Sequence, residues 1–138
     1  MKKLIALLLI TTMLSCSKNP ESNIEHLQGY WEIDEVMLPD GSKRDYNYNE
    51  TIDFFNITDS LTGFRKKLKP NFDGTFSTSD DAESITLVIE NDSLNIYYKT
   101  QFSEWKETVL EATETQLIIQ NQEQLRYIYK RYEPLDLN

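Results

Sequence analysis

Residues 85–99 read Ile-Thr-Leu-Val-Ile-Glu-Asn-Asp-Ser-Leu-Asn-Ile-Tyr-Tyr-Lys and carry the clearest structural signal in the chain. Apolar side chains occupy every second position on both sides of Asn91-Asp92-Ser93, a run of residue types common in turns. Successive side chains of a strand point to opposite faces, so a period of two predicts β-strands. The stretch therefore predicts a β-hairpin.

The same alternation, broken by short polar segments, continues in both directions from this hairpin. It predicts strands at about 29–38, 50–57, 62–69, 72–78, 83–90, 94–100, 104–111, 116–120 and 125–132. A helix is expected only at 20–26, where Asn19 can cap it and Pro20 suits the first helical position. Many short strands at regular spacing predict an all-β, antiparallel up-and-down meander that closes into a barrel or a two-sheet sandwich.

Composition restricts the class of protein. The chain has 138 residues, 39% of them hydrophobic, which suits a single domain. Its net charge of −9 argues against nucleic-acid binding, which requires a basic face. With one Cys and one His, a disulfide framework or a Cys/His metal site is not expected. We expect no cofactor, no metal and no enzymatic activity, since His26 has no evident catalytic partner.

The N-terminus has the features of a bacterial lipoprotein signal. Lys2 and Lys3 precede the uncharged run 4–14, which is shorter than the roughly 20 residues that span a bilayer. Met13-Leu14-Ser15-Cys16 resembles a lipobox, whose cysteine is lipidated and becomes the first mature residue. We therefore expect a signal peptide at 1–15, a lipid-anchored tether with a short helical turn at 16–26 and a barrel at 27–138. Lipidation would also explain a lone Cys16 in an oxidising envelope.

Ser17 bears on the location of the anchored protein. By resemblance to lipoprotein sorting rules, Asp after the lipidated cysteine retains a chain at the inner membrane, and Ser17 favours the outer membrane instead. The segment 17–19 also lacks the acidic residues of known surface-export signals. The expected location is the cell envelope, with the lipid in the outer membrane and the protein on the periplasmic side rather than the cell surface.

Two segments at opposite ends of the predicted barrel suggest a family. Gly29-Tyr30-Trp31 resembles the G-x-W entry strand of lipocalins, and 127–132 resembles their closing strand, which carries a basic residue. The chain from about 27 to 134 is similar to the lipocalin-like domain of small lipoproteins of Gram-negative bacteria, a calycin-type β-barrel. The resemblance implies that Gly29, Trp31 and Arg131 close the barrel, with the guanidinium stacked on the indole.

In such a barrel the ligand site is the lumen, which is lined by alternate strand residues. An eight-stranded barrel can be filled by its own side chains or can hold one small ligand. Both alternatives are open here. Inward alternation predicts a set of lumen residues: Phe54, Leu87, Ile89, Leu94, Ile96, Tyr98, Tyr127 and Tyr129.

The segment Arg65-Lys66-Lys67-Leu68-Lys69 is the one basic cluster of an acidic chain. Alternation places Arg65, Lys67 and Lys69 on one face of a strand. They could hold an anionic ligand or lipid headgroup at the barrel mouth. Alternatively, the strand is an exposed edge whose charges prevent aggregation.

Two functions follow from these expectations. The first is a lipid-anchored barrel that binds a small apolar or amphipathic ligand, with Phe54, Leu87, Ile96, Tyr98, Tyr129, Arg65 and Lys67 as candidate contacts. The second is an accessory lipoprotein with a filled barrel, which docks on an outer-membrane protein complex through exposed tyrosines. Asp59-Ser60-Leu61 and Asp92-Ser93-Leu94 also match a short bacterial O-glycosylation pattern, and chance alone often produces such patterns.

Overall fold

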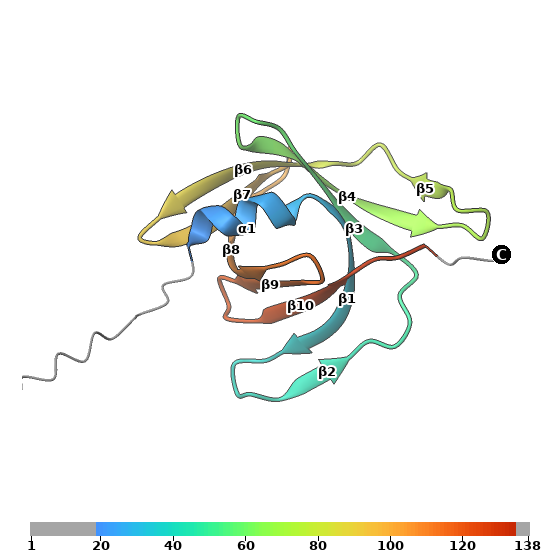
Figure 1. Cartoon of the computed structure of the whole chain (residues 1–138), viewed down its shortest axis with the longest axis horizontal. Helices are drawn as coiled ribbons and strands as arrows, with labels where there is room; N and C mark the ends of the chain where they lie inside the picture. Colours follow the sequence, from blue (N-terminus) through green and yellow to red (C-terminus); the bar gives the residue numbers. More distant parts are fainter. Residues whose placement is uncertain (1–18, 135–138) are drawn as a thin grey trace, which may run out of the picture.

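A computed structural model describes residues 19–134, and most of them form one antiparallel β-barrel (Figure 1). The barrel strands are β1 (Gly29–Met37), β3 (Ile52–Ile57), β4 (Thr62–Pro70), β6 (Glu83–Glu90), β7 (Ser93–Lys99), β8 (Glu104–Ala112), β9 (Gln116–Asn121) and β10 (Arg126–Arg131). Each strand pairs with its neighbours, and β10 pairs with β1, where Trp31 lies opposite Arg131. The pairing closes the sheet and confirms the predicted eight-stranded barrel.

Two further strands project beyond the barrel wall. β2 (Lys43–Asp45) pairs with the end of β1 and was not predicted, because its three residues are all polar and exposed. β5 (Phe76–Thr78) pairs with the end of β4 and is shorter than the predicted 72–78. The missing residues form a turn, in which Gly74 has a φ of +84° and Asp73 accepts a hydrogen bond from the Thr75 amide.

The hairpin quoted first has the expected geometry. Glu90 pairs with Ser93, and the two residues between them, Asn91 and Asp92, have φ values of 50° and 61°. Two-residue hairpin turns favour positive φ at both central positions because that twist matches the strands, and Asn and Asp tolerate it. The turn chemistry therefore fixes the register that places Leu87 opposite Ile96.

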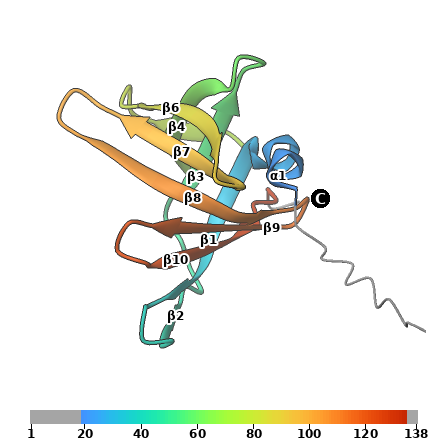
Figure 2. The same ribbon diagram turned by 90° about the vertical axis from the view of Figure 1, so that its left-hand side faces the viewer.

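Helix α1 (Pro20–Leu27) covers one end of the barrel, which we call the floor (Figure 2). Asn19 caps the helix, as predicted, through a 3.0 Å hydrogen bond from the Glu21 amide. The Asn23 side chain accepts a 3.0 Å hydrogen bond from the Ala112 amide at the end of β8, and Leu27 is fully buried. No helix among residues 19–134 is long and apolar enough to cross a membrane.

The lumen near the floor is packed solid. Its side chains are between 0% and 5% exposed and come from α1 and from six of the barrel strands: Leu27, Trp31, Phe55, Leu87, Leu94, Ile96, Val109, Ala112, Leu117 and Ile119. Such packing leaves no space for a ligand in this half. The filled alternative therefore holds for the floor, and any ligand space lies towards the opposite, open end.

Two predicted orientations are wrong. Phe54 faces outwards, because it pairs with Tyr30 while its neighbours Asp53 and Phe55 pair with the lumen residues Trp31 and Gly29. The Phe54 ring stacks on Tyr30 outside the barrel, with centroids 4.6 Å apart. Regular alternation from Gly29 onward predicts Met37 on the Trp31 face, but the register shifts between Ile33 and Glu35, so Val36, not Met37, pairs with Tyr127.

Candidate functional site

The floor is closed by Trp31 and Arg131, which come from the two strands that seal the barrel. The guanidinium carbon of Arg131 lies 3.6 Å from the centre of the Trp31 ring system, the geometry of a cation–π pair. The indole nitrogen donates a 2.9 Å hydrogen bond to the Leu27 carbonyl at the end of α1. Gly29 has a φ of +117°, and a β-carbon there would lie 2.8 Å from the Arg131 guanidinium. The close approach therefore requires glycine.

Arg131 also connects its own strand, β10, to the α1–β1 junction and to the β8–β9 turn. Its guanidinium donates to the carbonyls of Gln28 and His26, both at 2.8 Å, at the α1–β1 junction. On the other side it donates to the carbonyl of Glu114 at 3.0 Å, in the β8–β9 turn. These contacts use Arg131 fully in fixing the floor, so it serves structure and not ligand binding.

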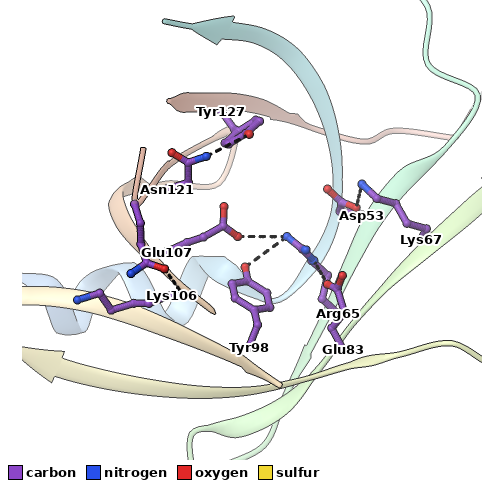
Figure 3. A network of polar contacts seen from close by, with 10 residues as sticks. Asp53, Arg65, Lys67, Glu83, Tyr98, Lys106, Glu107, Asn121 and Tyr127 are labelled. Atoms are coloured by element: carbon purple, nitrogen blue, oxygen red, sulfur yellow. Dashed lines mark hydrogen bonds and ion pairs between the residues drawn. The ribbon is translucent and has the colours of Figure 1, made fainter. Parts of the chain in front are cut away.

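Above the floor lies an ionic layer, defined here as Asp53, Arg65, Lys67, Glu83, Tyr98 and Glu107, which Figure 3 shows, together with the buried Tyr129, which interacts with Asp53. Arg65 is its centre: its guanidinium forms an ion pair with Glu83 and a second one, at 3.3 Å, with Glu107. The same guanidinium lies 4.4 Å from the Tyr98 ring centre. With side chains 13% and 8% exposed, Arg65 and Glu107 form a buried charge pair across the lumen.

A second pair in this layer joins Asp53 to Lys67. The carboxylate of Asp53 is 3% exposed, and its Oδ1 is in ion-pair contact with Nζ of Lys67. That oxygen accepts no well-directed hydrogen bond within residues 19–134, so the contact is one of charge and not of alignment. The Lys67 side chain is 65% exposed, and only its partner is buried.

Burial and charge shift several pKa values in the ionic layer. Burial raises the pKa of the Glu107 carboxyl, although the nearby Arg65 opposes the shift. Burial also raises the pKa of Tyr98 and of Tyr129 well above the usual range, and the charge of Asp53 adds to the effect on Tyr129. Burial opposes the charge of Arg65, but contacts with Tyr98 and Glu83 outweigh it and raise its pKa.

A chamber of about 290 Å³ opens on this layer from the solvent side. We call it the mouth chamber. Trp31 and Ile33 lie at its inner limit, and the buried carboxylate of Asp53 lines its wall beside Lys67. Four tyrosines supply most of its aromatic surface: Tyr46, Tyr48, Tyr127 and Tyr129. The chamber therefore combines aromatic rings with one buried carboxylate, as a site for a small polar or amphipathic molecule would.

Two larger hollows are less suited to hold a ligand in the lumen. One of about 680 Å³ lies at the rim between the β5–β6 and β7–β8 connections, and Lys67 lines both it and the mouth chamber. Another of about 460 Å³ is lined mainly by outward-facing residues of β6, β7 and β8, including Thr86, Tyr97 and Lys106. The ionic layer borders both spaces: Arg65 and Glu83 line the rim hollow, whereas the buried carboxylate of Asp53 and Tyr129 line the mouth chamber.

The candidate ligand residues separate into four groups. Leu87 and Ile96 belong to the packed floor, together with Leu94. Tyr98 and Arg65 lie in the ionic layer, and Tyr129 and Lys67 line the mouth chamber. Phe54 is outside the barrel. Cys16 lies outside the described residues.

The basic strand differs from both sequence interpretations. β4 pairs with β3, β5 and β6, so it is not an edge strand. Its three lumen-side cations are already matched by carboxylates: Arg65 by Glu83 and Glu107, Lys67 by Asp53 and Lys69 by Glu50. None of these three cations is therefore left free to anchor an anionic headgroup.

The three carboxylates of the ionic layer were missed from the sequence: Glu83 and the two buried ones, Asp53 and Glu107. Glu107 shares its strand face with Trp105 and Val109, an alternation that could have indicated an inward carboxylate. Asp53 likewise shares a face with Phe55. Both were passed over because acidic residues are usually assigned to the solvent face. No group of three or more potential metal-ligating side chains occurs within residues 19–134.

The architecture defines a class of protein: a closed eight-stranded antiparallel barrel, plugged at one end by a Trp–Arg pair beneath a short helix and hollow at the other. Residues 27–119 match the lipocalin-like domain family, and the chain belongs to that family.

Among solved structures, the chain is similar to a lipocalin-like protein from Bacteroides uniformis, with a TM-score of 0.48, 10% identity, and coverage of 78% of this chain and 99% of that one. It is also similar to an uncharacterized protein from Bacteroides eggerthii, with a TM-score of 0.48, 15% identity, and coverage of 76% and 98%. No curated protein matches the sequence. The family assignment therefore rests on the match to residues 27–119.

Proposed function

We propose that this protein is a lipid-anchored lipocalin-like barrel of the cell envelope that binds one small amphipathic ligand in the mouth chamber. The observation that carries the proposal is the chamber itself, about 290 Å³, open to solvent and walled by tyrosines around the buried carboxylate of Asp53. Pockets for drug-sized ligands begin at roughly 300 Å³, so the ligand is small.

The division of the lumen narrows the ligand class. The floor side chains are at most 5% exposed, so an extended acyl chain has no channel to enter. The chamber wall instead alternates tyrosine rings with Asn49, Asp53 and Lys67. This combination favours a compact molecule with one flat or apolar part and one polar part over a fatty acid.

The place of α1 orients the barrel on its proposed anchor. The four residue steps from Cys16 to Pro20 reach at most about 14 Å, so a lipid on Cys16 would stay close to the floor. Strands such as β8, nine residues long, separate floor and mouth by on the order of 20 Å once strand tilt is included. We therefore propose that the mouth faces away from the membrane and takes its ligand from the aqueous phase.

Ligand binding can be measured on a soluble chain that begins at Ser17. Trp31 lies at the inner limit of the chamber, so a Trp105→Phe background leaves one indole as reporter. A panel of small ring compounds should change Trp31 fluorescence with saturation. Two further variants add an indole, so their binding is measured by calorimetry: Ile33→Trp should fill the chamber and abolish binding, whereas Thr86→Trp on the outer face should not. Equal binding by both variants would exclude the chamber.

The anchor is tested by mass and by mutation. Membrane-extracted protein should have the mass of an acylated chain that begins at Cys16, and Cys16→Ser should release the protein from membranes. An unmodified mass, or a Cys16→Ser variant that stays in the membrane fraction, would remove the anchor from the proposal. Protease accessibility on intact cells then distinguishes the periplasmic side from the cell surface.

A docking function is the second candidate, and it rests on three exposed aromatic side chains. Tyr48, Phe72 and Phe102 are 85%, 89% and 87% exposed and lie in connections between strands. Tyrosine and phenylalanine are enriched in protein interfaces. Because Tyr48 also lines the mouth chamber, the test replaces only Phe72 and Phe102 by serine, which should leave chamber binding intact but weaken crosslinking to any envelope partner. We propose no catalytic activity for the mouth chamber or for the exposed aromatic side chains.

A further inference from the structure

Asp53 is the one chamber group whose position calls for a ligand partner. It is a buried carboxylate, 3% exposed, on the chamber wall. Within residues 19–134, its Oδ1 accepts no well-directed hydrogen bond and is in ion-pair contact with Lys67, while the Tyr129 hydroxyl hydrogen-bonds to the carboxylate. Buried carboxylates normally accept several hydrogen bonds, because an unpaired buried acceptor costs free energy. The site therefore has an acceptor in place before any ligand arrives.

Lys67 occupies that acceptor in a replaceable way. Its side chain is 65% exposed and carries its charge on a flexible four-carbon stem. An ion pair with a half-solvated lysine contributes little, since the ammonium regains water when it leaves. Because Lys67 also lines the rim hollow of about 680 Å³, its side chain has space to move out of the chamber.

The charges around the chamber disfavour an anionic ligand. Arg65 is bound to Glu83 and Glu107, and Lys69 is bound to Glu50, which also lines the chamber. An anion would have to take Lys67 from Asp53 and then leave that carboxylate buried without a countercharge, which is the costly outcome. A cation has the opposite effect: it replaces Lys67 and keeps the Asp53 charge compensated.

The aromatic wall suits the same kind of ligand. Tyr46, Tyr127 and Tyr129 line the chamber around Asp53, and ring faces attract cations, more strongly where water is excluded. The chain as a whole carries a net charge of −9, which raises the local concentration of cations near its surface. The Asp53 carboxylate, the tyrosine rings and the net charge of the chain all favour a positively charged ligand.

We propose that the ligand of the mouth chamber is a small organic amine, held as its ammonium form by Asp53 after exchange with Lys67 and covered by the tyrosine rings. This inference rests on the proposed function, since it assigns a chemical class to the ligand of that chamber. It makes Asp53 the acceptor that determines specificity and Lys67 an internal competitor for the same acceptor.

Competition between Lys67 and the ligand predicts opposite changes in amine affinity for two substitutions, Asp53→Asn and Lys67→Met, each of which removes one charge. The probes are phenethylamine, phenethyl alcohol and phenylpropionate, which share a ring and differ in charge, and binding is followed by Trp31 fluorescence in the Trp105→Phe background. The amine should bind about tenfold or more tightly than the alcohol, and the acid should bind least. Asp53→Asn should remove the preference for the amine. Lys67→Met should strengthen amine binding severalfold, because it removes the competitor.

Lys66→Met is the matched control, since it removes a lysine from the same strand at an outward-facing position. It should leave all three affinities unchanged. Weaker amine binding by Lys67→Met, or a preference for phenylpropionate, would overturn the inference. Equal binding of amine and alcohol, blocked by Ile33→Trp, would also overturn it while leaving the chamber as the ligand site. If Asp53→Asn fails to fold, the sign of the Lys67→Met effect decides.

Discussion

The two halves of the lumen differ in the side chains that line them: the floor half is apolar and filled, and the mouth half is charged and partly hollow. Near α1, side chains from six of the barrel strands are apolar and interlocked, with Trp31, Phe55 and Ile96 fully buried. Towards the mouth, the same strands carry the ionic layer centred on Arg65 and leave a chamber of about 290 Å³ beside it. Only a few residues separate the two halves along each strand, as between Val109 and Glu107 on β8.

The difference shows how a small barrel can be stable and still hold a ligand space. Apolar packing stabilises in proportion to the area removed from water and tolerates no gap. Buried ion pairs contribute little net stability, but they keep charged groups in fixed positions. The floor therefore supplies the stability, and the ionic layer supplies a polar surface that the floor could not provide.

The largest expected effect is at the floor. Trp31→Ala should destabilise the protein by about 3–5 kcal/mol in chemical denaturation, because an aromatic side chain is lost from a site that cannot collapse. Arg131→Ala should cost less, about 1–3 kcal/mol, through its lost carbonyl hydrogen bonds and ring contact. In a double-mutant cycle the losses should be less than additive, and strict additivity would show that the two side chains do not cooperate.

The ionic layer should respond in a different way. Arg65→Met should cost about 3 kcal/mol, because Glu107 is left buried without its countercharge. Adding Glu107→Leu should recover most of that loss, since an apolar pair can replace a buried ion pair at little cost. The floor offers no such rescue. A double variant less stable than Arg65→Met alone would show that the ionic layer is itself a main source of stability.

The sequence predicted the floor better than the chamber, and the reason is physical. Trp31, Leu87 and Ile96 could be placed because their alternation is unambiguous and their hairpin turn fixes the register. In β3 both faces carry apolar residues, Ile52 and Phe54 on one and Phe55 on the other, so alternation alone could not choose the lumen face. The choice depends on pairing with β1, which is not a property of β3.

The chamber depends on pairings distant in sequence. Arg65 and Glu107 are 42 residues apart in sequence. Asp53 and Tyr129, which both line the chamber, come from β3 and β10. No local pattern joins them. The bulge in β1 between Ile33 and Glu35 added a further difficulty, because one extra residue reverses the facing of Val36 and Met37. Side-chain types could be assigned from sequence, but their convergence could not.

Weakening the contact between α1 and the barrel should reduce the free energy of unfolding by an intermediate amount. Asn23→Ala leaves the buried Ala112 amide without its acceptor, which should cost about 1–2 kcal/mol and loosen the helix from the floor. Glu25→Ala, on the exposed side of the same helix, is the control. Amide hydrogen exchange should speed up at Ala112 and along α1 while protection around the mouth stays unchanged. Faster exchange throughout the barrel would show that floor and mouth unfold together.

The smallest effect at neutral pH, and the sharpest test of the division, concerns the buried tyrosines of the ionic layer. Burial raises the pKa of Tyr98 and Tyr129 well above the usual value of about 10, so the folded state keeps both hydroxyls neutral. Because the folded pKa lies above the unfolded one, the stability linked to these groups is present below about pH 10 and is lost as pH rises beyond it. The floor contains no such group.

Ultraviolet absorbance of tyrosinate should therefore show two tyrosines that ionise last, together with unfolding. Tyr129→Phe should move the alkaline unfolding midpoint upwards, because one group that resists ionisation in the folded state is removed. Tyr48→Phe, at a side chain 85% exposed, should leave the midpoint where it is. If all tyrosines ionise together without unfolding, water reaches Tyr98 and Tyr129 freely, and the ionic layer belongs to the open chamber and not to the packed part of the lumen.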